Sequence, residues 1–390
     1  MLGGPFSPWP AFTEEEAAAV SAVLLSNRVN QWTGGEVKAF EAEFAAFADT
    51  PHAIALANGT VALDLALMGL GIGARFGGGA EDEVIVTPRS FVASASSVLN
   101  AGARPVFADI CPDAQVITPE TVAPLIGPQT RGIIAVHLAG WPCDMDGLRA
   151  LADTHGLHLI EDCAQAHGAT YKGRPVGGLG DVAAWSFCQD KIMSTGGEGG
   201  MVTCRDPALW ERMWAHKDHG KSWAQVTRQD HPPGFRWLHE TPGTNWRLTE
   251  MQAAIGRIQL KRMGAWTAAR RRNAAALMEA ATGLPGFRVP EIPAHIGHGF
   301  YKFYLFTTEA AEEAGWTRDR MAAEFTASGV PAMQGICPEI YREKAFGPHP
   351  RLPVAKRLGE TSLMFLVHPT LTPAEIAKTC DEIRRIGALP

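Results

Sequence analysis

The feature that most constrains the fold is a regular alternation of short apolar runs with helical patterns over the first two-thirds of the chain. The runs are rich in β-branched residues, and seven of them predict strands: "HAIAL" (52–56), "EVIVT" (83–87), "RPVFAD" (104–109), "RGIIAVH" (131–137), "LHLIED" (157–162), "VAAWSF" (182–187) and "GMVTC" (200–204). Helical patterns separate several of them, at 60–70, 91–102 and 144–156. Nearly continuous apolar strands alternating with helices predict an α/β fold, with a mainly parallel seven-stranded sheet between helices.

The pattern changes in the last third of the chain. Residues 248–282 predict long helices, and after "GLPGF" (283–287) shorter apolar runs are followed by helices near 317–328 and from 373. This change predicts a smaller α+β C-terminal domain, and a length of 390 residues agrees with two or three domains. We expect an N-terminal arm (1–30), a large domain (31–262) and a small C-terminal domain (263–390).

Composition narrows the class of protein. The net charge is −6, and the longest basic tract is "ARRR" (269–272), so a nucleic-acid partner is not expected. No apolar run reaches the length that spans a bilayer, and the N-terminus lacks the pattern of a signal peptide. Seven scattered cysteines without a C-x-x-C pair suit reduced thiols. We therefore expect a cytoplasmic protein without a membrane partner.

Polar residues follow several of the predicted strands. Ligands of open α/β sheets bind at the carboxyl ends of the strands, so chemistry is expected at these residues. They are Asn58, Gly59, Thr60, Ser90, Phe91, His137, Asp162, Gln165, Ser186 and Lys191. The N-G-T turn at the start of a helix offers free N–H groups and a hydroxyl, which can seat a phosphate, although most such turns are simple caps.

The stretch "WSFCQDKIMSTGGEGGMV" (185–202) permits a cysteine nucleophile, a phosphate-binding loop or a reactive lysine. No neighbouring histidine accompanies Cys188, so a buried structural thiol is the expectation. Lys191 directly follows a buried strand, where desolvation favours the neutral amine that attacks carbonyls. The alternative for Lys191 is a surface ion pair with Asp190 or Glu198.

A metal site is not expected. His155 and His158 precede Glu161 and Asp162, but His155 ends a helix whereas the other three lie on a strand, so they should not share one centre. Glu161 is expected to cap the turn that follows its strand.

Taken together, a phosphate seat, an acid at one strand end and a lysine at a later strand end match the needs of pyridoxal 5′-phosphate (PLP). This cofactor requires a Schiff-base lysine, an acidic partner for its pyridine nitrogen and an anchor for its phosphate. Unit charges 4 Å apart near a protein surface interact by about 4 kcal/mol, which would keep the ring nitrogen protonated opposite Asp162.

At this point the chain resembles the fold-type I sugar aminotransferases of the DegT/DnrJ/EryC1/StrS group. The resemblance covers nearly the whole chain, in seven blocks that occur in the family's order. They are "NQWTGGEVKAFEAEFAAF", "LANGTVALDLAL", "TPRSFVASASSVLNAGARPVFADI", "VHLAGWPCDMD", "LIEDCAQAHGATYKGRPVGGLGDVAAWSF", "K…STGGEGGMV" and "TNWRLTEMQAAIGRIQL".

The resemblance implies a role for each site residue. Lys191 would be the catalytic lysine bound to PLP, and Asp162 the partner of the pyridinium nitrogen. Phe91 would stack on the ring, although packing is the alternative for Phe91 and Ser186, and Gln165 would lie near the phenolic oxygen. The expected phosphate contacts are Gly59, Thr60, Ser186 and, from the second subunit of a homodimer, Asn245. "QWTGG" (31–35) would help to shape the sugar pocket.

The implied activity is amino transfer from glutamate (or glutamine) to a keto group of a nucleotide-linked deoxysugar, with C4 favoured. An aminocyclitol aminotransferase and a PLP-dependent sugar dehydratase are the alternatives, and Lys191 argues against the dehydratase, which carries a histidine there. A PLP-binding regulator would need a DNA-binding module, for which the chain shows no pattern. Unlike many family members, the chain has no histidine in the segment "QGICPEIYREKAF" (334–346).

Overall fold

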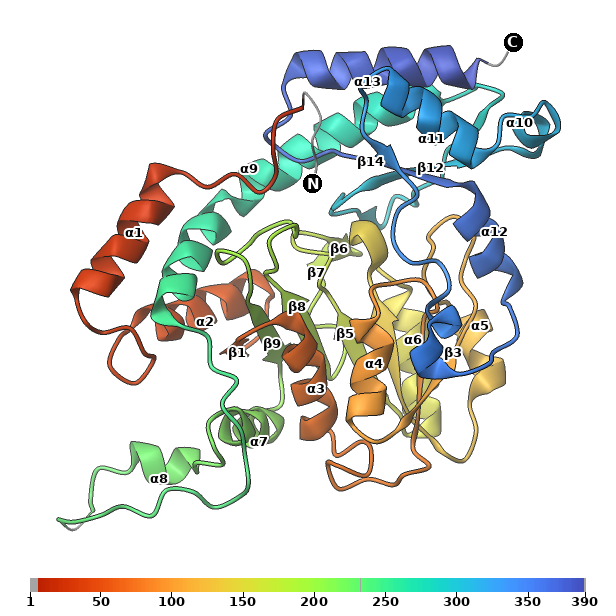
Figure 1. The fold of residues 1–390 in the computed structure, drawn as a ribbon. Coiled ribbons are helices and arrows are strands. Elements are labelled where there is room, and N and C mark those ends of the chain that lie inside the picture. The colour runs from red at the N-terminus through yellow and green to blue at the C-terminus, as the bar shows by residue number, and fades with distance from the viewer. Residues whose placement is uncertain (1–5, 232, 389–390) are drawn as a thin grey trace.

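A seven-stranded sheet forms the centre of the large domain in the computed structural model, which describes residues 6–231 and 233–388 (Figure 1). The strand order is β1-β9-β8-β5-β4-β2-β3. The strands are β1 (His52–Leu56), β2 (Glu83–Val86), β3 (Arg104–Phe107), β4 (Thr130–Val136), β5 (His158–Asp162), β8 (Val182–Ser186) and β9 (Gly200–Cys204). All seven predicted strands are present, each within two residues of its expected ends.

The sheet is mainly parallel, as predicted. Strands β3, β2, β4, β5 and β8 pair in parallel, whereas β9 runs antiparallel to both of its neighbours, β8 and β1. All strands except β9 therefore run in the same direction, and the carboxyl ends of these six strands lie on the same side of the sheet. The reversed strand β9 returns the chain from that side immediately after the segment that contains Lys191.

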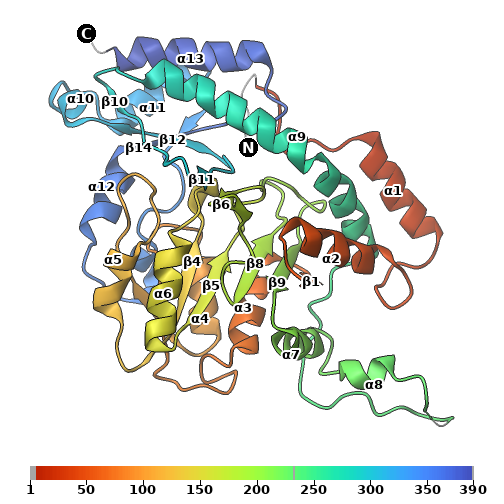
Figure 2. The same ribbon diagram turned by 180° about the vertical axis from the view of Figure 1, so that it is seen from behind.

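Helices cover both faces of the sheet because successive side chains of each strand point to opposite faces. Ile134 and Ile160 pack with α3 and α4 on one face, and their neighbours Ile133 and Leu159 pack with α6 on the other. Figures 1 and 2 show these two layers from opposite sides. The helices of the large domain are α2 (Glu36–Phe47), α3 (Gly59–Gly69), α4 (Ala93–Asn100), α5 (Pro119–Val122), α6 (Met145–His155), α7 (Pro207–Lys217) and α8 (Trp223–Thr227).

The small domain contains a four-stranded sheet in the order β10-β12-β14-β13, covered by helices α11 and α13. Its elements are β10 (Phe287–Arg288), β12 (Phe303–Thr307), β13 (Ala332–Met333), β14 (Ser362–Phe365), α10 (Glu309–Glu313), α11 (Arg318–Ala327), α12 (Pro353–Thr361) and α13 (Pro373–Gly387). A three-stranded sheet joins the domains, because β11 (Ile296–Gly297) pairs with β6 (Thr170–Tyr171), which pairs with β7 (Arg174–Pro175).

One long helix, α9 (Glu250–Ala281), belongs to both domains. Ala253 and Met263 pack with α2 in the core of the large domain, whereas Ala274 and Leu277 pack in the core of the small domain. The boundary expected between residues 262 and 263 therefore lies inside a continuous helix, and the long helices predicted for 248–282 are one.

The described part of the N-terminal arm, residues 6–30, lies along α9 (Figure 1). Helix α1 (Glu14–Leu25) packs against α9, and the buried Glu16 carboxylate accepts a hydrogen bond from Arg262 Nη1 at 2.7 Å.

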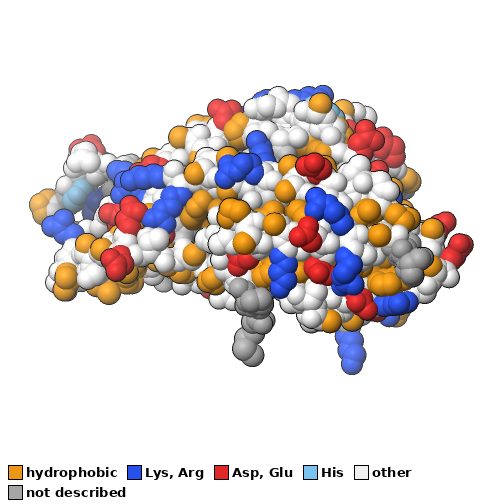
Figure 3. Space-filling view, turned by 90° about the horizontal axis from the view of Figure 1, so that it is seen from above, with side chains coloured by type: hydrophobic (Ala, Val, Ile, Leu, Met, Phe, Trp, Pro, Cys, Tyr) orange, Lys and Arg blue, Asp and Glu red, His pale blue; other side chains and the backbone are white. Residues whose placement is uncertain are grey.

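The surface shows mixed charge. Seen from above, basic and acidic side chains are interspersed (Figure 3). Among the described residues, no helix combines the length and apolar character needed to cross a membrane.

Candidate active site

A cavity of about 550 Å³ opens at the carboxyl ends of the central strands. It gathers side chains from the ends of β1, β5 and β8, which lie up to 130 residues apart in sequence but adjoin at one edge of the sheet. Seven of the eight predicted site residues line it: Gly59, Thr60, Phe91, Asp162, Gln165, Ser186 and Lys191.

The start of α3 forms one wall of this cavity. The Asn58 side chain caps the helix by accepting a hydrogen bond from the Val61 N–H at 3.0 Å. Gly59 and Thr60 are its first two residues, so their N–H groups have no partner within the helix. A Cβ at Gly59 would lie 2.6 Å from Ser186 Cβ, so only glycine lets the Ser186 side chain approach the helix start this closely. Free N–H groups and a hydroxyl at a helix N-terminus suit an anion such as phosphate.

Asp162 is a buried carboxylate without a cationic partner. It is 5% exposed, and within the described part of the chain its carboxylate forms no ion pair. Its Oδ2 accepts a hydrogen bond from Ser94 Oγ at 2.7 Å, and Oδ1 accepts one from the Ala164 N–H at 3.1 Å. Ser90 lies 2.9 Å from Ser94, Oγ to Oγ. A charge held by neutral donors at a cavity wall suits a cationic ring nitrogen.

Phe91 and Gln165 present their side chains to the same space. Phe91 is 57% exposed, which argues against a packing role and leaves the ring open to stack on a planar ligand. The Gln165 Oε1 atom accepts a hydrogen bond from the Ala139 N–H at 2.9 Å, so its amide nitrogen is available as a donor.

Lys191 lies in the turn between β8 and β9 and is half-buried. The surface ion pair with Asp190 or Glu198 is not present, because Lys191 forms no ion pair with any described residue. Its Nζ lies instead 5.4 Å from the centre of the Tyr301 ring. Without an ion pair at contact distance, the Lys191 amine remains available at the cavity, although the Asp190 carboxylate lies near enough to interact with its charge.

Asp190 and Tyr301 form a hydrogen-bonded pair beside this lysine. The Tyr301 hydroxyl donates to Asp190 Oδ2 at 2.5 Å. Burial opposes the charge on Asp190, but Lys191 and the Tyr301 hydroxyl outweigh it and lower the pKa of this carboxyl. Burial, together with Asp190, raises the pKa of Tyr301 well above its usual value. The pair therefore places a carboxylate and a neutral phenol next to Lys191.

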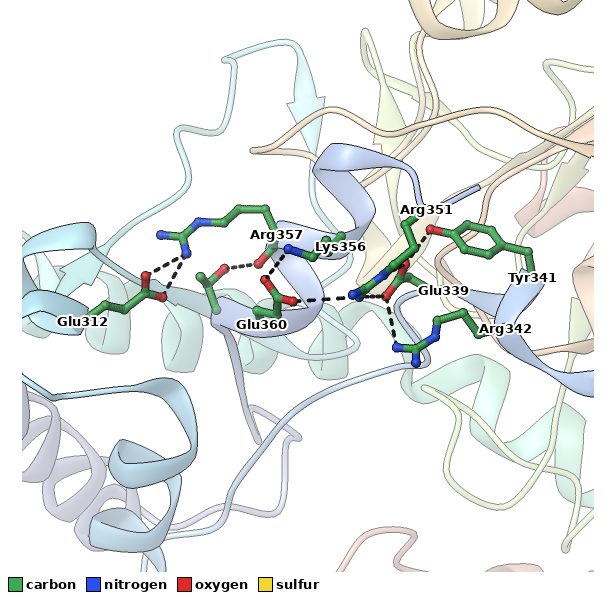
Figure 4. A network of polar contacts seen from close by, with 9 residues as sticks. Glu312, Glu339, Tyr341, Arg342, Arg351, Lys356, Arg357 and Glu360 are labelled. Carbon is green, nitrogen blue, oxygen red and sulfur yellow. Dashed lines mark hydrogen bonds and ion pairs between the residues drawn. The ribbon is translucent and has the colours of Figure 1, made fainter. Parts of the chain in front are cut away.

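The small domain closes the cavity with Tyr301 and Ile336. Ile336 belongs to the histidine-free segment 334–346, which Glu339 holds in place (Figure 4). The Glu339 carboxylate accepts hydrogen bonds from the Tyr341 hydroxyl at 2.6 Å and from Arg351 Nε at 2.9 Å. The sequence patterns missed Tyr301 and Ile336, since neither follows a strand of the large sheet.

Comparison with known proteins agrees with this geometry. The model of the DegT/DnrJ/EryC1/StrS aminotransferase family matches residues 10–384. The chain belongs to this family.

Similar proteins support the assignment. The crystal structure of an aminotransferase from Psychrobacter cryohalolentis has a TM-score of 0.94 and 57% identity, over 98% of each chain. The dTDP-3-amino-3,4,6-trideoxy-alpha-D-glucose transaminase of Streptomyces venezuelae is 37% identical over 95% of this chain and 91% of its own. The L-glutamine:2-deoxy-scyllo-inosose aminotransferase of Streptomyces fradiae is 40% identical over 69% of this chain and 64% of its own.

The residues of the cavity fit PLP, the cofactor that this class of aminotransferase implies. Among the described residues, Asp162 has no cation and Lys191 no carboxylate within ion-pair distance, and the Phe91 ring is 57% exposed at the cavity. The fourth group is the N-terminus of α3, where Gly59 leaves room beside Ser186. Each of these groups has the chemistry that one part of PLP requires.

One expectation for the stretch 185–202 needs correction in this aminotransferase. Cys188 is half-buried and lines the cavity instead of being fully buried, although burial, then Glu198 and Asp190, raise the pKa of its thiol and disfavour a nucleophilic thiolate. The glycines of this stretch are required by the conformation and close packing of the backbone. Gly196 and Gly197 have φ of 91° and 130°, and a Cβ at Gly200 would lie 2.3 Å from the Asn58 carbonyl oxygen.

A cluster of potential metal ligands lies behind the sheet edge, at His137, Glu161 and Cys163. Two of the three, His137 and Glu161, already have hydrogen-bond partners. His137 Nε2 lies 3.0 Å from Glu161 Oε2, and His137 Nδ1 accepts from the Cys143 N–H. Glu161 also accepts from three N–H groups, at Gly177, Leu179 and Gly180. It is a turn-capping acid, as predicted, but the turn it caps precedes β8 and is not the one that directly follows its own strand β5. The cluster therefore stabilises the turn.

Asn245 is the one predicted site residue outside the cavity of its own chain. It is exposed and pairs with Asp218 in an isolated β-bridge. Buried Asp218 also accepts hydrogen bonds from Gln31 Nε2 at 2.8 Å and from Arg247 Nη1 at 2.7 Å. Asp218 thus joins "QWTGG" (31–35) to "TNWR" (244–247), and neither segment lines the Lys191 cavity.

Proposed function

We propose that this aminotransferase uses PLP to transfer an amino group from glutamate (or glutamine) to a keto group of a nucleotide-linked deoxysugar, at C4. The observation that carries the proposal is the meeting of Lys191, Asp162 and the start of α3 in one cavity. The named substrate of the relative from Streptomyces venezuelae supports a nucleotide-sugar acceptor.

Three groups of this chain would hold the cofactor. The start of α3 at Gly59 and Thr60, with the Ser186 hydroxyl, would bind the phosphate, because free N–H groups there favour an anion. Asp162 would keep a proton on the ring nitrogen, and Phe91 would orient the ring by stacking. When bound, PLP supplies an electron sink for the bond broken at the donor's α-carbon.

Lys191 would first carry the cofactor and then move the proton. Its Nζ would take the proton from the α-carbon of the donor and return it to the neighbouring carbon. The Asp190–Tyr301 pair beside it would hold a negative charge close to the ammonium form that results. Ile336 and Tyr301, from the small domain, would exclude water from that side of the cavity.

The test is a screen of acceptors with the purified enzyme. Enzyme converted to its pyridoxamine 5′-phosphate form by glutamate would be mixed with dTDP-, UDP- and GDP-linked keto-sugars, with ketones at C4 or C3, and with a keto-inositol. Return of the PLP absorbance, with the aminated product seen by mass spectrometry, would identify the acceptor. Lys191→Ala is the negative control, which we expect to bind PLP but not to convert it with glutamate.

Each other outcome contradicts part of the proposal. Normal turnover by Lys191→Ala would remove the role of this lysine. Exclusive use of the keto-inositol would favour the aminocyclitol alternative, to which the relative from Streptomyces fradiae points. A deoxysugar formed without consumption of glutamate would identify a dehydratase.

We further propose that the enzyme works as a homodimer in which Asn245 reaches the neighbour's phosphate site. Two features support this. Asn245 is exposed and lies outside its own cavity, and the segment that precedes it extends away from the body of the chain (Figure 1). That segment also exposes an aromatic pair, Phe235 (79%) and Trp237 (85%), with ring centres 4.7 Å apart, as is typical of an interface.

A further inference from the structure

The backbone carbonyl of Lys191 has a hydrogen-bond partner far away in the sequence. Trp9 Nε1 donates to the Lys191 oxygen at 2.8 Å, across 182 positions. Lys191 lies in a turn that belongs to no strand or helix, and its own N–H donates to the Cys188 carbonyl at 3.1 Å. The Trp9 indole is therefore a direct constraint on the backbone position of this lysine.

Trp9 is itself held by the small domain and by α9. It is 8% exposed, and its ring lies 5.9 Å from the His368 ring in a stacked arrangement. The Arg270 guanidinium lies 4.9 Å from the Trp9 ring centre, and Trp266 meets Trp9 edge-on at 5.1 Å. Arg270 is 1% exposed and forms no ion pair with a described carboxylate, so the face of the Trp9 ring helps to offset its charge.

Other residues of the N-terminal segment that contains Trp9 also bind the small domain. Residues 6–13, here called the N-terminal strap, are held by two further contacts. Glu375 accepts hydrogen bonds from the Ser7 N–H at 2.5 Å and the Ser7 hydroxyl at 3.1 Å. Thr370 Oγ1 donates to the Pro8 carbonyl at 2.8 Å. The strap thus joins the small domain to the turn that contains Lys191.

We propose that Trp9 is a positioning residue for Lys191, and that the N-terminal strap is part of the scaffold of the active site. The indole N–H fixes the Lys191 carbonyl on one side, while the Asp190–Tyr301 bond fixes the neighbouring residue on the other. Because both supports come from the strap or the small domain, the placement of the lysine depends on the docking of that domain. The catalytic part of this inference rests on the proposed function of Lys191.

The test compares Trp9→Phe with the wild type. Phenylalanine keeps an aromatic ring over Arg270 but removes the N–H donor, which leaves the Lys191 carbonyl unpaired. We expect faster amide hydrogen exchange in residues 187–196 of the PLP-free protein. In the loaded enzyme, the single-turnover rate with glutamate should fall by ~2- to 12-fold, the range for loss of one hydrogen bond, while KM for the donor and acceptor stays within about two-fold.

Trp210→Phe is the matched control. Trp210 Nε1 also donates to a backbone carbonyl, that of Ala53 at 3.3 Å, but this bond lies at the start of β1, away from the Lys191 cavity. The control should change neither the exchange of residues 187–196 nor the single-turnover rate. If Trp9→Phe behaves like Trp210→Phe, the positioning role is overturned.

A second variant covers the case in which Trp9→Phe does not fold. Glu375→Gln weakens the anchor of the strap at Ser7 without altering the Trp9 ring, and it should also speed exchange in residues 187–196. Unchanged exchange would contradict the proposal. The hydrogen-exchange measurement tests the positioning role of Trp9 independently of the proposed function of Lys191, because it uses protein without PLP. Failure of the Lys191→Ala test would remove the proposed function and leave the effect of Trp9 on exchange standing.

Discussion

At the scale of single residues, the proposed chemistry depends on Asp162, a carboxylate that forms no ion pair with any described residue. Asp162 is buried with neutral donors only, and the carboxylate charge is what the proposed contact with a protonated ring nitrogen requires. Asparagine has nearly the same shape and keeps an acceptor for Ser94, but it carries no charge.

We therefore expect Asp162→Asn to fold normally and to lose activity. Charges about 4 Å apart near a surface interact by about 4 kcal/mol, so the single-turnover rate with glutamate should fall by up to ~1000-fold. Stopped-flow absorbance with saturating glutamate measures this rate. Ser94→Ala, which removes a hydrogen bond but keeps the charge, should lower it by only about ten-fold or less. Equal losses in the two variants would show that the charge of Asp162 is not what matters.

At the scale of elements, segment 334–346 depends on one carboxylate. Glu339 is buried, and it holds Tyr341, Arg342 and Arg351 around the turn that brings Ile336 to the cavity. Burial opposes its charge, but the bonds to Arg351 and Tyr341 outweigh it and lower the pKa of Glu339. A carboxyl whose pKa is lower in the folded state stabilises the fold above its unfolded pKa of about 4.3, and this stabilisation is lost as the pH falls through the folded value.

We expect Glu339→Gln to lower the free energy of unfolding at pH 7 by about 1–3 kcal/mol, since the charged hydrogen bonds are lost. The difference from the wild type should shrink as the pH falls below about 4. Urea denaturation at several pH values measures both effects, and KM for the acceptor should rise because Ile336 is less well placed. Glu360→Gln is the control, because Glu360 forms only exposed ion pairs with Arg351 and Lys356 and should change stability by less than about 1 kcal/mol. Similar losses in both variants would contradict the central role of Glu339.

From the sequence we could predict the parts of the site that follow from local patterns of apolar and polar residues. The seven strands were found because each is a short apolar run, and the residues at their ends converge because parallel strands share an edge. Tyr301, Ile336 and Trp9 could not be predicted in this way, because each comes to Lys191 or to its cavity only through the packing of one domain or segment on another. The histidine–glutamate–cysteine cluster was also missed, since His137 and Cys163 are brought together by the pairing of β4 with β5.

At the scale of the whole molecule, the proposed dimer makes a prediction about mixtures of inactive subunits. Lys191→Ala and Asn245→Ala should each be inactive or weakly active as homodimers. If Asn245 acts across the interface, a mixed dimer has one site with both residues intact. Co-expression with two different affinity tags, followed by purification on both, yields the mixed dimer for assay. The purified mixed dimer should have about half of the wild-type activity, because one of its two sites is complete, and the unfractionated random mixture about a quarter, because only half of its dimers are mixed.

No recovery in the mixed dimer would place Asn245 in its own chain's site or outside both sites. A protein that remains monomeric in light-scattering measurements at assay concentration would contradict the dimer itself.

Helix α9, which the two domains share, also determines how the protein unfolds. The first half of α9 covers Phe40 of α2, where a Cβ at Gly256 would lie 2.6 Å from the Phe40 ring, and the second half carries Ala274 and Leu277 into the core of the small domain. Unwinding of either half removes backbone hydrogen bonds that support the other. Heat or denaturant should therefore melt both cores in one transition, and neither domain should survive proteolytic excision as a folded fragment.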